Sequence, residues 1–160
     1  MEWRAEKRPQ EPNSQSDARP TRSLRWCGMA ELKFPYKNYG PGVYRPVVPI
    51  TITRAGRSVQ YEALVDSGAD MNIFDAQLAD ILGFDVTAGR KEEVHGITGN
   101  PQVYYVHPVT IGIGGTMEFK TEAGFMPNMG GMTYGVVGQK GFFEFTRITF
   151  DRKKQRVEIK

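Results

Sequence analysis

The chain has 160 residues, of which 39% are hydrophobic, and a mean hydropathy of −0.46, values typical of one soluble globular domain. Its net charge is +3, but residues 1–28 hold six Lys/Arg and four Asp/Glu, so the remainder carries only +1, which argues against a nucleic-acid-binding face. With one cysteine, Cys27, and two histidines, neither an internal disulfide nor a structural zinc site is expected.

The N-terminal residues 1–28 are rich in Pro, Ser, Arg, Gln and Glu and have no periodicity, which predicts a disordered tail. Met29 follows this tail, and one hypothesis is that translation of the native protein starts there. No apolar run approaches the roughly 18–20 residues that span a bilayer, and no apolar core of the signal-peptide type is present. We therefore expect a cytoplasmic protein without a membrane span.

Residues 29–42 form a lead-in segment, and from Val43 onward the sequence predicts short strands separated by Gly, Pro and Asn. The run VYRPVVPITI is typical of a strand, with Pro46 and Pro49 placing it at an edge or a bulge. Residues 54–57 predict a turn. In the following run SVQYEALV, alternation predicts a strand with one face formed by Val59, Tyr61, Ala63 and Val65.

The clearest helix pattern is DAQLADILGFD, in which Asp75 is placed to cap the start and Gly83 to end the helix. Its apolar positions recur with a period of about 3.6 and are Ala76, Leu78, Ala79, Ile81 and Leu82. Two hairpins are predicted next, one with Gly96 and Gly99 at its tip and one around Gly114–Gly115. A short strand in MTYGVVG, a helical turn in QKGFFEF and a closing hairpin in RITFDRKKQRVEIK follow, so the fold is predicted to be mostly β with one helix.

Asp66 ends the apolar run YEALV and is followed by Ser67 and Gly68. Burying a carboxylate in an apolar setting is unfavourable unless donors or a second carboxyl compensate its charge. A tight turn at Gly68 frees backbone amides to point at the carboxylate, and the Ser67 hydroxyl adds a further donor. The tripeptide alone is a common turn, but a strand that resumes after it and a helix beyond that strand favour a catalytic role.

These segments together resemble the retropepsin-like aspartic proteases. ALVDSGADMNIF is similar to their active-site segment, VVG at Val136, Val137 and Gly138 resembles their second signature, and VHGITGN stands where they have a glycine-rich flap. The resemblance covers residues 43–160. It implies a closed, acid-protease-like β-barrel subunit with one short-to-medium helix, a dimer, a peptide or protein substrate and no cofactor or metal.

The resemblance also implies a role for each matching residue. Asp66 would be the catalytic carboxylate, Ser67 would brace the two active-site loops, and Gly68 would lie against the substrate. Ala69 and Asp70 would line a subsite wall, while the flap would consist of Gly96, Ile97, Thr98 and Gly99. Three positions depart from the usual pattern: Asn72 in place of Ser or Thr, Gln139 in place of Arg, and Thr98 within the flap.

The sequence contains a single Asp-Ser-Gly and no Asp-Thr-Gly. Aspartic proteolysis needs two carboxyls, one ionised and one protonated. A two-fold homodimer supplies the second carboxyl without further sequence, so Asp66 is expected to act beside the Asp66 of a second copy.

Two other functions stay open. One is a peptide-binding or dimerisation module that keeps this fold without cutting. The other is a serine hydrolase using Ser67 with His95 or His107, although no G-x-S-x-G motif supports it. We expect His95 to face solvent or the substrate edge, and His107 to lie at a strand end.

The remaining patterns are expected to be structural. The glycine-rich runs lack the residues of a nucleotide-binding loop, and the basic run DRKKQR is interpreted as a solvated turn. The aromatic residues are expected in the core and at an interface; they are Tyr104, Tyr105, Phe142, Phe143 and Phe145.

Overall fold

The structure is a computed structural model that describes residues 31–95 and 101–160. The predicted tail at residues 1–28 and the predicted flap residues Gly96, Ile97, Thr98 and Gly99 lie outside the described residues. The strands are β1 (Leu32–Pro35), β2 (Lys37–Asn38), β3 (Tyr44–Arg45), β4 (Val47–Arg54), β5 (Arg57–Val65), β6 (Ile73–Asp75), β7 (Arg90–His95), β8 (Pro101–Ile113), β9 (Met117–Met126), β10 (Gly135–Val137), β11 (Ile148–Asp151) and β12 (Arg156–Ile159). The helical elements are α1 (Leu78–Leu82) and the 3₁₀ turns Val86–Ala88 and Phe143–Phe145.

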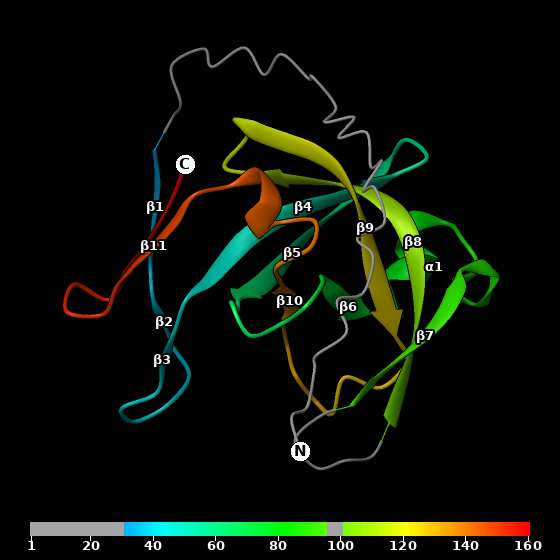
Figure 1. The fold of residues 1–160 in the computed structure, drawn as a ribbon, viewed down its shortest axis with the longest axis horizontal. Helices are drawn as coiled ribbons and strands as arrows, with labels where there is room; N and C mark the ends of the chain where they lie inside the picture. The colour runs from blue at the N-terminus through cyan, green and yellow to red at the C-terminus, as the bar shows by residue number, and fades with distance from the viewer. Residues whose placement is uncertain (1–30, 96–100) are drawn as a thin grey trace, which may run out of the picture.

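Seven strands form the main sheet in the order β4-β5-β10-β6-β9-β8-β7 (Figure 1). Strand β4 pairs with both β5 and β8, so the sheet closes on itself. The inner faces enclose one apolar cluster whose largest fully buried side chains include Phe74, Phe125 and Phe142. The prediction of a mostly β fold with one helix is confirmed.

Hairpin turns set the register of this sheet. The predicted turn at residues 54–57 joins β4 to β5, with Ala55 at φ 47° and Gly56 at φ 81°. A two-residue hairpin loop favours such left-handed backbone because its twist matches that of the strands. Gly114 and Gly115, at φ 59° and 67°, join β8 to β9 in the same conformation. Both predicted turns are confirmed.

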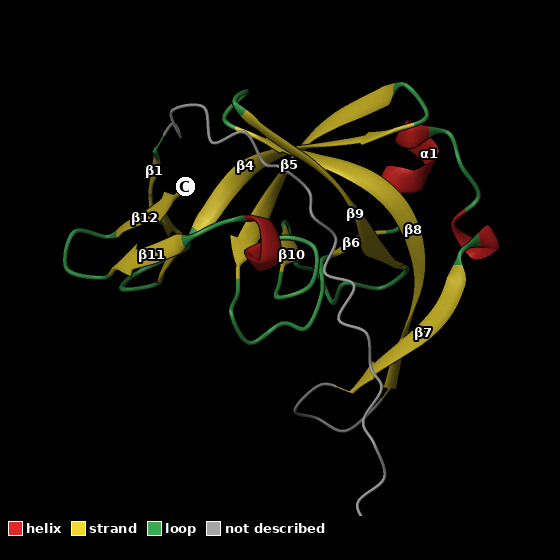
Figure 2. Ribbon diagram, turned by 45° about the horizontal axis from the view of Figure 1, so that its top comes forward, coloured by secondary structure: helices red, strands yellow, loops and turns green. Residues whose placement is uncertain are grey.

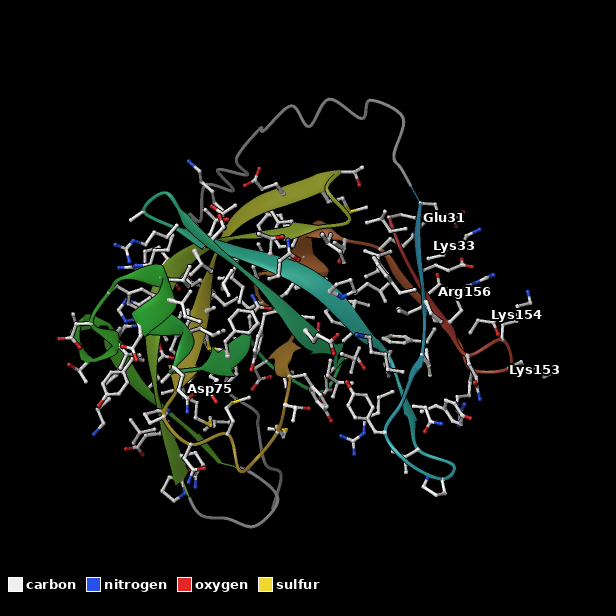
Figure 3. All side chains as sticks on the ribbon, turned by 180° about the vertical axis from the view of Figure 1, so that it is seen from behind. Glu31, Lys33, Asp75, Lys153, Lys154 and Arg156 are labelled. Carbon is white, nitrogen blue, oxygen red and sulfur yellow. The ribbon has the colours of Figure 1, made fainter. Side chains whose placement is uncertain are left out.

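Helix α1 is shorter than predicted and begins at Leu78 rather than near Asp75. Asp75 belongs to β6 and pairs with Met126 of β9, and its Oδ1 accepts a hydrogen bond from Gln77 N at 2.8 Å (Figure 3 labels Asp75). Asp75, which the sequence pattern places at the start of the helix, therefore lies in a strand because it pairs with β9, and the helix begins later. Gly83 ends the helix at φ 74°, as predicted.

The prediction for His107 was wrong, because it lies in the middle of β8 and not at a strand end. Its ring is 3% exposed, packs near Phe84 and Phe125, and forms a 2.8 Å hydrogen bond between Nε2 and the carbonyl of Val86. The following residue, Pro108, is tolerated inside β8 where that strand pairs with β9 at Glu122. A proline therefore does not mark the end of this strand.

A separate three-stranded sheet, β1-β12-β11, lies on the side of the molecule opposite the β7–β8 hairpin (Figure 2). Strands β11 and β12 are the predicted closing hairpin, and the lead-in segment adds β1 against β12 in register from Leu32↔Ile159 to Pro35↔Arg156. Val157 and Ile159 of β12 are fully buried and join the main core. No helix of the described residues is long and apolar enough to cross a membrane.

Candidate active site

The two segments singled out in the sequence lie side by side in the main sheet. Strand β10 runs parallel to β5, with Val136 beside Leu64 and Val137 beside Val65. The next residue after β5, Asp66, donates its N–H to the carbonyl of Val137 at 3.1 Å. The pairing therefore fixes the backbone of Asp66 against the second signature.

A tight turn surrounds the Asp66 carboxylate. Its Oδ1 accepts a hydrogen bond from Gly68 N at 2.8 Å, and its carbonyl accepts one from Ala69 N at 3.2 Å. Asp66 is half-buried, whereas Ser67 and Gly68 are exposed. The carboxylate is thus held by a backbone donor, as the sequence predicted, while its surroundings stay open to solvent.

Gly138 allows the two segments to approach closely. A Cβ at this position would lie 2.5 Å from the carbonyl oxygen of Ala69 and 2.7 Å from that of Met71. Beyond it, Gln139 N donates to Ala69 O and Lys140 N to Asp70 O, both at 2.8 Å. The second signature therefore supports the backbone of the active-site segment through residues 69–71.

Gln139, one of the three departures from the family pattern, has a defined contact. Its Nε2 donates a 2.7 Å hydrogen bond to the carbonyl of Ser67. This bond ties the residue beside Asp66 to the chain after β10. Gln139 therefore helps to steady the loop that follows Asp66.

Asn72, another departure, is fully buried. Its Oδ1 accepts from Gly138 N at 3.1 Å, and its Nδ2 donates to the carbonyl of Glu122 at 3.3 Å. Its own carbonyl accepts from Gly124 N at 2.8 Å. A buried amide must find partners for both ends, and here those partners join the active-site segment to β9 and to the second signature.

Charged side chains connect the β7–β8 hairpin to this frame. Arg90 of β7 contacts Glu92 at 2.7 Å and Glu122 of β9 at 3.3 Å, and Lys140 lies 3.7 Å from Glu122. Tyr104 of β8 donates to Glu92 Oε2 at 2.8 Å. Strands β7 and β8, which lie on either side of the predicted flap, are therefore linked through Glu122 to Lys140, two residues after Gly138.

These contacts shift the pKa values of the groups involved. Hydrogen bonds from Arg90 lower the pKa of both Glu92 and Glu122, and those carboxylates raise the pKa of Arg90. Burial, with the Glu92 hydrogen bond, raises the pKa of Tyr104 to about 12. Arg90, Glu92 and Glu122 thus stay ionised, and Tyr104 stays protonated, through the neutral range.

The predicted serine–histidine pair does not fit the described geometry. His107 is buried among aromatic rings and its Nε2 is engaged by the carbonyl of Val86, whereas Ser67 is exposed. The side chain of His95 lies outside the described residues. Within residues 31–95 and 101–160, no three His, Cys, Asp or Glu side chains are grouped as metal ligands would be.

Among the predicted aromatic residues, Tyr104 and Phe142 are buried, but Phe145 is 49% exposed.

Sequence reasoning missed the roles of Arg90, Glu122 and Lys140, which lie on three separate segments. No local pattern marks them, because only the folded sheet brings β7, β9 and the end of β10 together.

A surface hollow of about 470 Å³ includes Thr53, Arg54, Thr110 and Lys120 and none of the predicted site residues.

Comparison with known proteins gives consistent results. A family model described as aspartyl protease matches residues 48–140. The sequence matches none of the curated proteins with which it was compared. Among solved structures, the fold is similar to a retropepsin-like aspartic protease from Rickettsia conorii, with a TM-score of 0.59 and 18% identity over 81% of this chain and 89% of that chain.

Two further structures have lower TM-scores. The EIAV protease in complex with an inhibitor has a TM-score of 0.44 and 23% identity, over 59% of this chain and 81% of that chain. The retroviral protease-like domain of Ddi1 from Leishmania major has a TM-score of 0.43 and 21% identity, over 68% of this chain and 82% of that chain.

Proposed function

Since the chain belongs to the aspartyl protease family, we propose that it is an aspartic endopeptidase that hydrolyses peptide bonds as a homodimer. Asp66 of each subunit contributes one carboxyl to a shared site. Its substrates are peptides or unfolded protein segments, and the chemistry requires no cofactor.

One observation carries this proposal: the half-buried Asp66 at the end of β5 accepts a backbone hydrogen bond from Gly68 and is framed by β10. The same turn contact occurs in purely structural turns, so it supports catalysis only together with the placement of Asp66 against β10 and the family match. Because the sequence contains one Asp-Ser-Gly, the second carboxyl comes from a second copy.

In the proposed reaction, two Asp66 carboxyls face one water molecule and share one proton, because two like charges at that distance cannot both be ionised. The ionised carboxylate accepts a proton from the water as its oxygen attacks the scissile carbonyl. The protonated carboxyl donates to the carbonyl oxygen, and a proton then passes to the leaving amine. Gly68 N–H holds one carboxylate oxygen in place throughout.

The test uses the full-length protein, a mixed peptide library and the variant Asp66→Asn. Removing a general acid–base group costs about 10²- to 10⁴-fold in rate, so Asp66→Asn is expected to lose cleavage by at least that factor and to keep its melting temperature. Asp80→Asn, the same chemical change on the exposed face of α1, is the matched control and should cleave normally. Pepstatin should inhibit the wild type.

Two results would contradict the proposal. Near-normal turnover by Asp66→Asn would exclude the two-carboxyl mechanism. Absence of cleavage by a verified dimer at acidic to neutral pH would instead favour the non-catalytic binding module. A fluorophosphonate probe that labels Ser67, together with loss of activity in Ser67→Ala, would identify a serine hydrolase.

A further inference from the structure

A row of polar side chains crosses four strands on the outer face of the main sheet. Paired residues of neighbouring strands point to the same face of a sheet. The row consists of Ser58 (β5), Thr53 (β4), Thr110 (β8) and Lys120 (β9), which are paired in this order. Ile52, which precedes Thr53, is fully buried in the core, so the row faces solvent. With strands about 4.8 Å apart, the row is roughly 14 Å long.

The row borders the surface hollow of about 470 Å³. Strand β4 pairs with β8 only as far as Thr53, and the chain then turns through Ala55 and Gly56 into β5. This separation of β4 from β8 leaves the hollow between the turn and β8. Two cations, Arg54 and Lys120, line it together with threonine hydroxyl groups, and none of the described residues that line it is acidic.

Arg54 is held in place at this hollow. Its guanidinium carbon lies 4.4 Å from the centre of the Phe84 ring, and its Nη1 donates to the carbonyl of Pro108 at 3.0 Å. A guanidinium has five N–H donors, so most of them remain free for a ligand. Such a fixed cation suits a carboxylate or phosphate group.

The second cation, Lys120, is exposed. Within residues 31–95 and 101–160, neither Lys120 nor Arg54 forms an ion pair. Of the acids two residues away on β9, Glu122 is paired with Arg90, and Glu118 does not line the hollow. The charge of the hollow is therefore not neutralised by its own side chains, and an anionic ligand is the complementary one.

The hollow lies far from Asp66. Gly56 lines the hollow and directly precedes β5, whereas Asp66 directly follows that strand. Figure 1 shows the β4–β5 turn and β10 at opposite ends of β5. At about 3.3 Å per residue, the nine residues of β5 separate the two places by roughly 30 Å. An extended peptide advances by about 3.5 Å per residue, so a segment bound in the hollow lies at least about eight residues from a peptide bond at Asp66.

We propose that the hollow and the adjoining row form an exosite that binds an acidic segment of a protein substrate, at least about eight residues from the bond that is cleaved. This inference rests on the proposed function, because it names the class of substrate that the protein selects. Carboxylates of the segment bind Arg54 and Lys120, and its backbone lies along the hydroxyl groups of Thr53 and Thr110. The length of the row matches about four residues of extended chain, whereas a single free phosphate would fill only part of it.

The test compares matched peptides as substrates of the full-length protein. The peptide that is cleaved best in the mixed library is extended, at each end in turn, by a run of glutamates behind a Gly/Ser spacer. Spacers of about 3 and about 12 residues reach about 10 and about 40 Å. The long spacer should lower KM roughly three- to tenfold and leave kcat unchanged, because the added contacts are equal in the bound substrate and the transition state. The short spacer, glutamine in place of glutamate, and high salt should each abolish this gain.

Lys120→Glu tests the exosite itself. Because Lys120 is exposed, the variant should fold normally, and the long-spaced glutamates should no longer lower KM. Lys153→Glu, the same charge reversal in the exposed turn between β11 and β12, is the matched control and should keep the gain. Arg54→Gln should act like Lys120→Glu, provided that its melting curve shows an intact fold; if it does not fold, Lys120→Glu decides.

Direct binding separates this inference from the proposed function. A fluorescent peptide with the long-spaced glutamates is titrated into Asp66→Asn and followed by anisotropy, so that no substrate is consumed. Binding that Lys120→Glu weakens, without cleavage by the wild type, would refute the proposed function alone. Cleavage with equal KM for both peptides, or a gain that Lys120→Glu and Lys153→Glu reduce alike, would overturn the inference. Binding of inorganic phosphate in the hollow without any gain from the glutamates would also overturn it, since the hollow would then be a site for small anions.

Discussion

The backbone around Asp66 and the outer edge of β11 differ in how completely one chain satisfies them. Around Asp66, the N–H of Asp66 and the carbonyls of Ala69 and Asp70 bond to β10 or to the residues just after it, and buried Asn72 finds partners at both ends. At the β11 edge, the peptide groups of Ile148 and Phe150 have no strand beside them within the described residues. One chain therefore fixes the backbone around Asp66, but it leaves the outer edge of β11 without a neighbouring strand among the described residues.

This difference separates two kinds of substitution. Changes in the frame around Asp66 should act on the stability of each subunit, because they remove contacts within one chain. Changes at the β11 edge should have little effect on stability, because they remove few contacts within the chain. The predictions below test that separation, beginning with the largest expected effect.

Gly138→Ala should be the most damaging change in the frame. Its Cβ would meet two backbone carbonyl oxygens, of Ala69 and Met71, at 2.5 and 2.7 Å, and neither can move without breaking the pairing beside Asp66. We expect a loss of about 3 kcal/mol or more in unfolding free energy, measured by urea denaturation. Gly112→Ala, whose Cβ would have its nearest neighbour at 3.6 Å, is the control; equal stability of the two variants would contradict the close approach.

Asn72→Ala should destabilise the subunit by about 2–4 kcal/mol, because it leaves the buried N–H of Gly138 without its partner and removes one of the two donors to the carbonyl of Glu122. Denaturation of the monomer at low concentration measures this loss. Asn128→Ala removes an exposed turn contact to Gly130 N instead and should cost less than about 1 kcal/mol. If both variants melt alike, Asn72 is not the link between β9 and the second signature.

At the β11 edge, Phe150→Thr should have a much smaller effect on stability. Phe150 is already 41% exposed, so the variant should lose at most about 1 kcal/mol in unfolding free energy, measured by urea denaturation. Ile81→Thr, at a more exposed site on α1, is the control and should lose no more than this. A loss as large as that of Asn72→Ala would contradict the open β11 edge.

The sequence predicted the strands and turns around Asp66 better than the side-chain contacts that hold them together. The hairpins at Gly56 and at Gly114–Gly115, and the strand before Gly138, follow from local turn chemistry and apolar runs, so short-range patterns were enough. Asn72 was visible only as a departure from the family pattern. Its partners lie on β9 and after β10, and no local signal reports a contact over 50 or 66 residues.

The errors have the same origin. Asp75 was expected to cap α1, but parallel pairing of β6 with β9 draws it into a strand. Ile81 was expected on the buried stripe of the helix, yet it is 54% exposed, because a helix of five residues covers only part of the core. Strand β1 was missed, since its four residues gain their partner only when β12 folds against the core.

Glu122→Gln should give the smallest effect, and that effect should depend on pH. Hydrogen bonding from Arg90 lowers the folded pKa of Glu122 below its ordinary value of 4.5, so the carboxylate stabilises the fold above about pH 4.5. That stabilisation disappears as the pH falls through the lower folded pKa. Because the Glu122 side chain is 40% exposed and that of Lys140 is 62% exposed, screening limits the contribution to roughly 0.3–1 kcal/mol. The difference in unfolding free energy between wild type and Glu122→Gln should therefore be present at pH 7 and shrink as the pH falls below about 4.5, with Glu118→Gln on the same strand as the control for the loss of one surface charge. A difference that stays constant with pH would mean that Glu122 acts through packing, so the link between β7 and the residues after Gly138 would not be electrostatic.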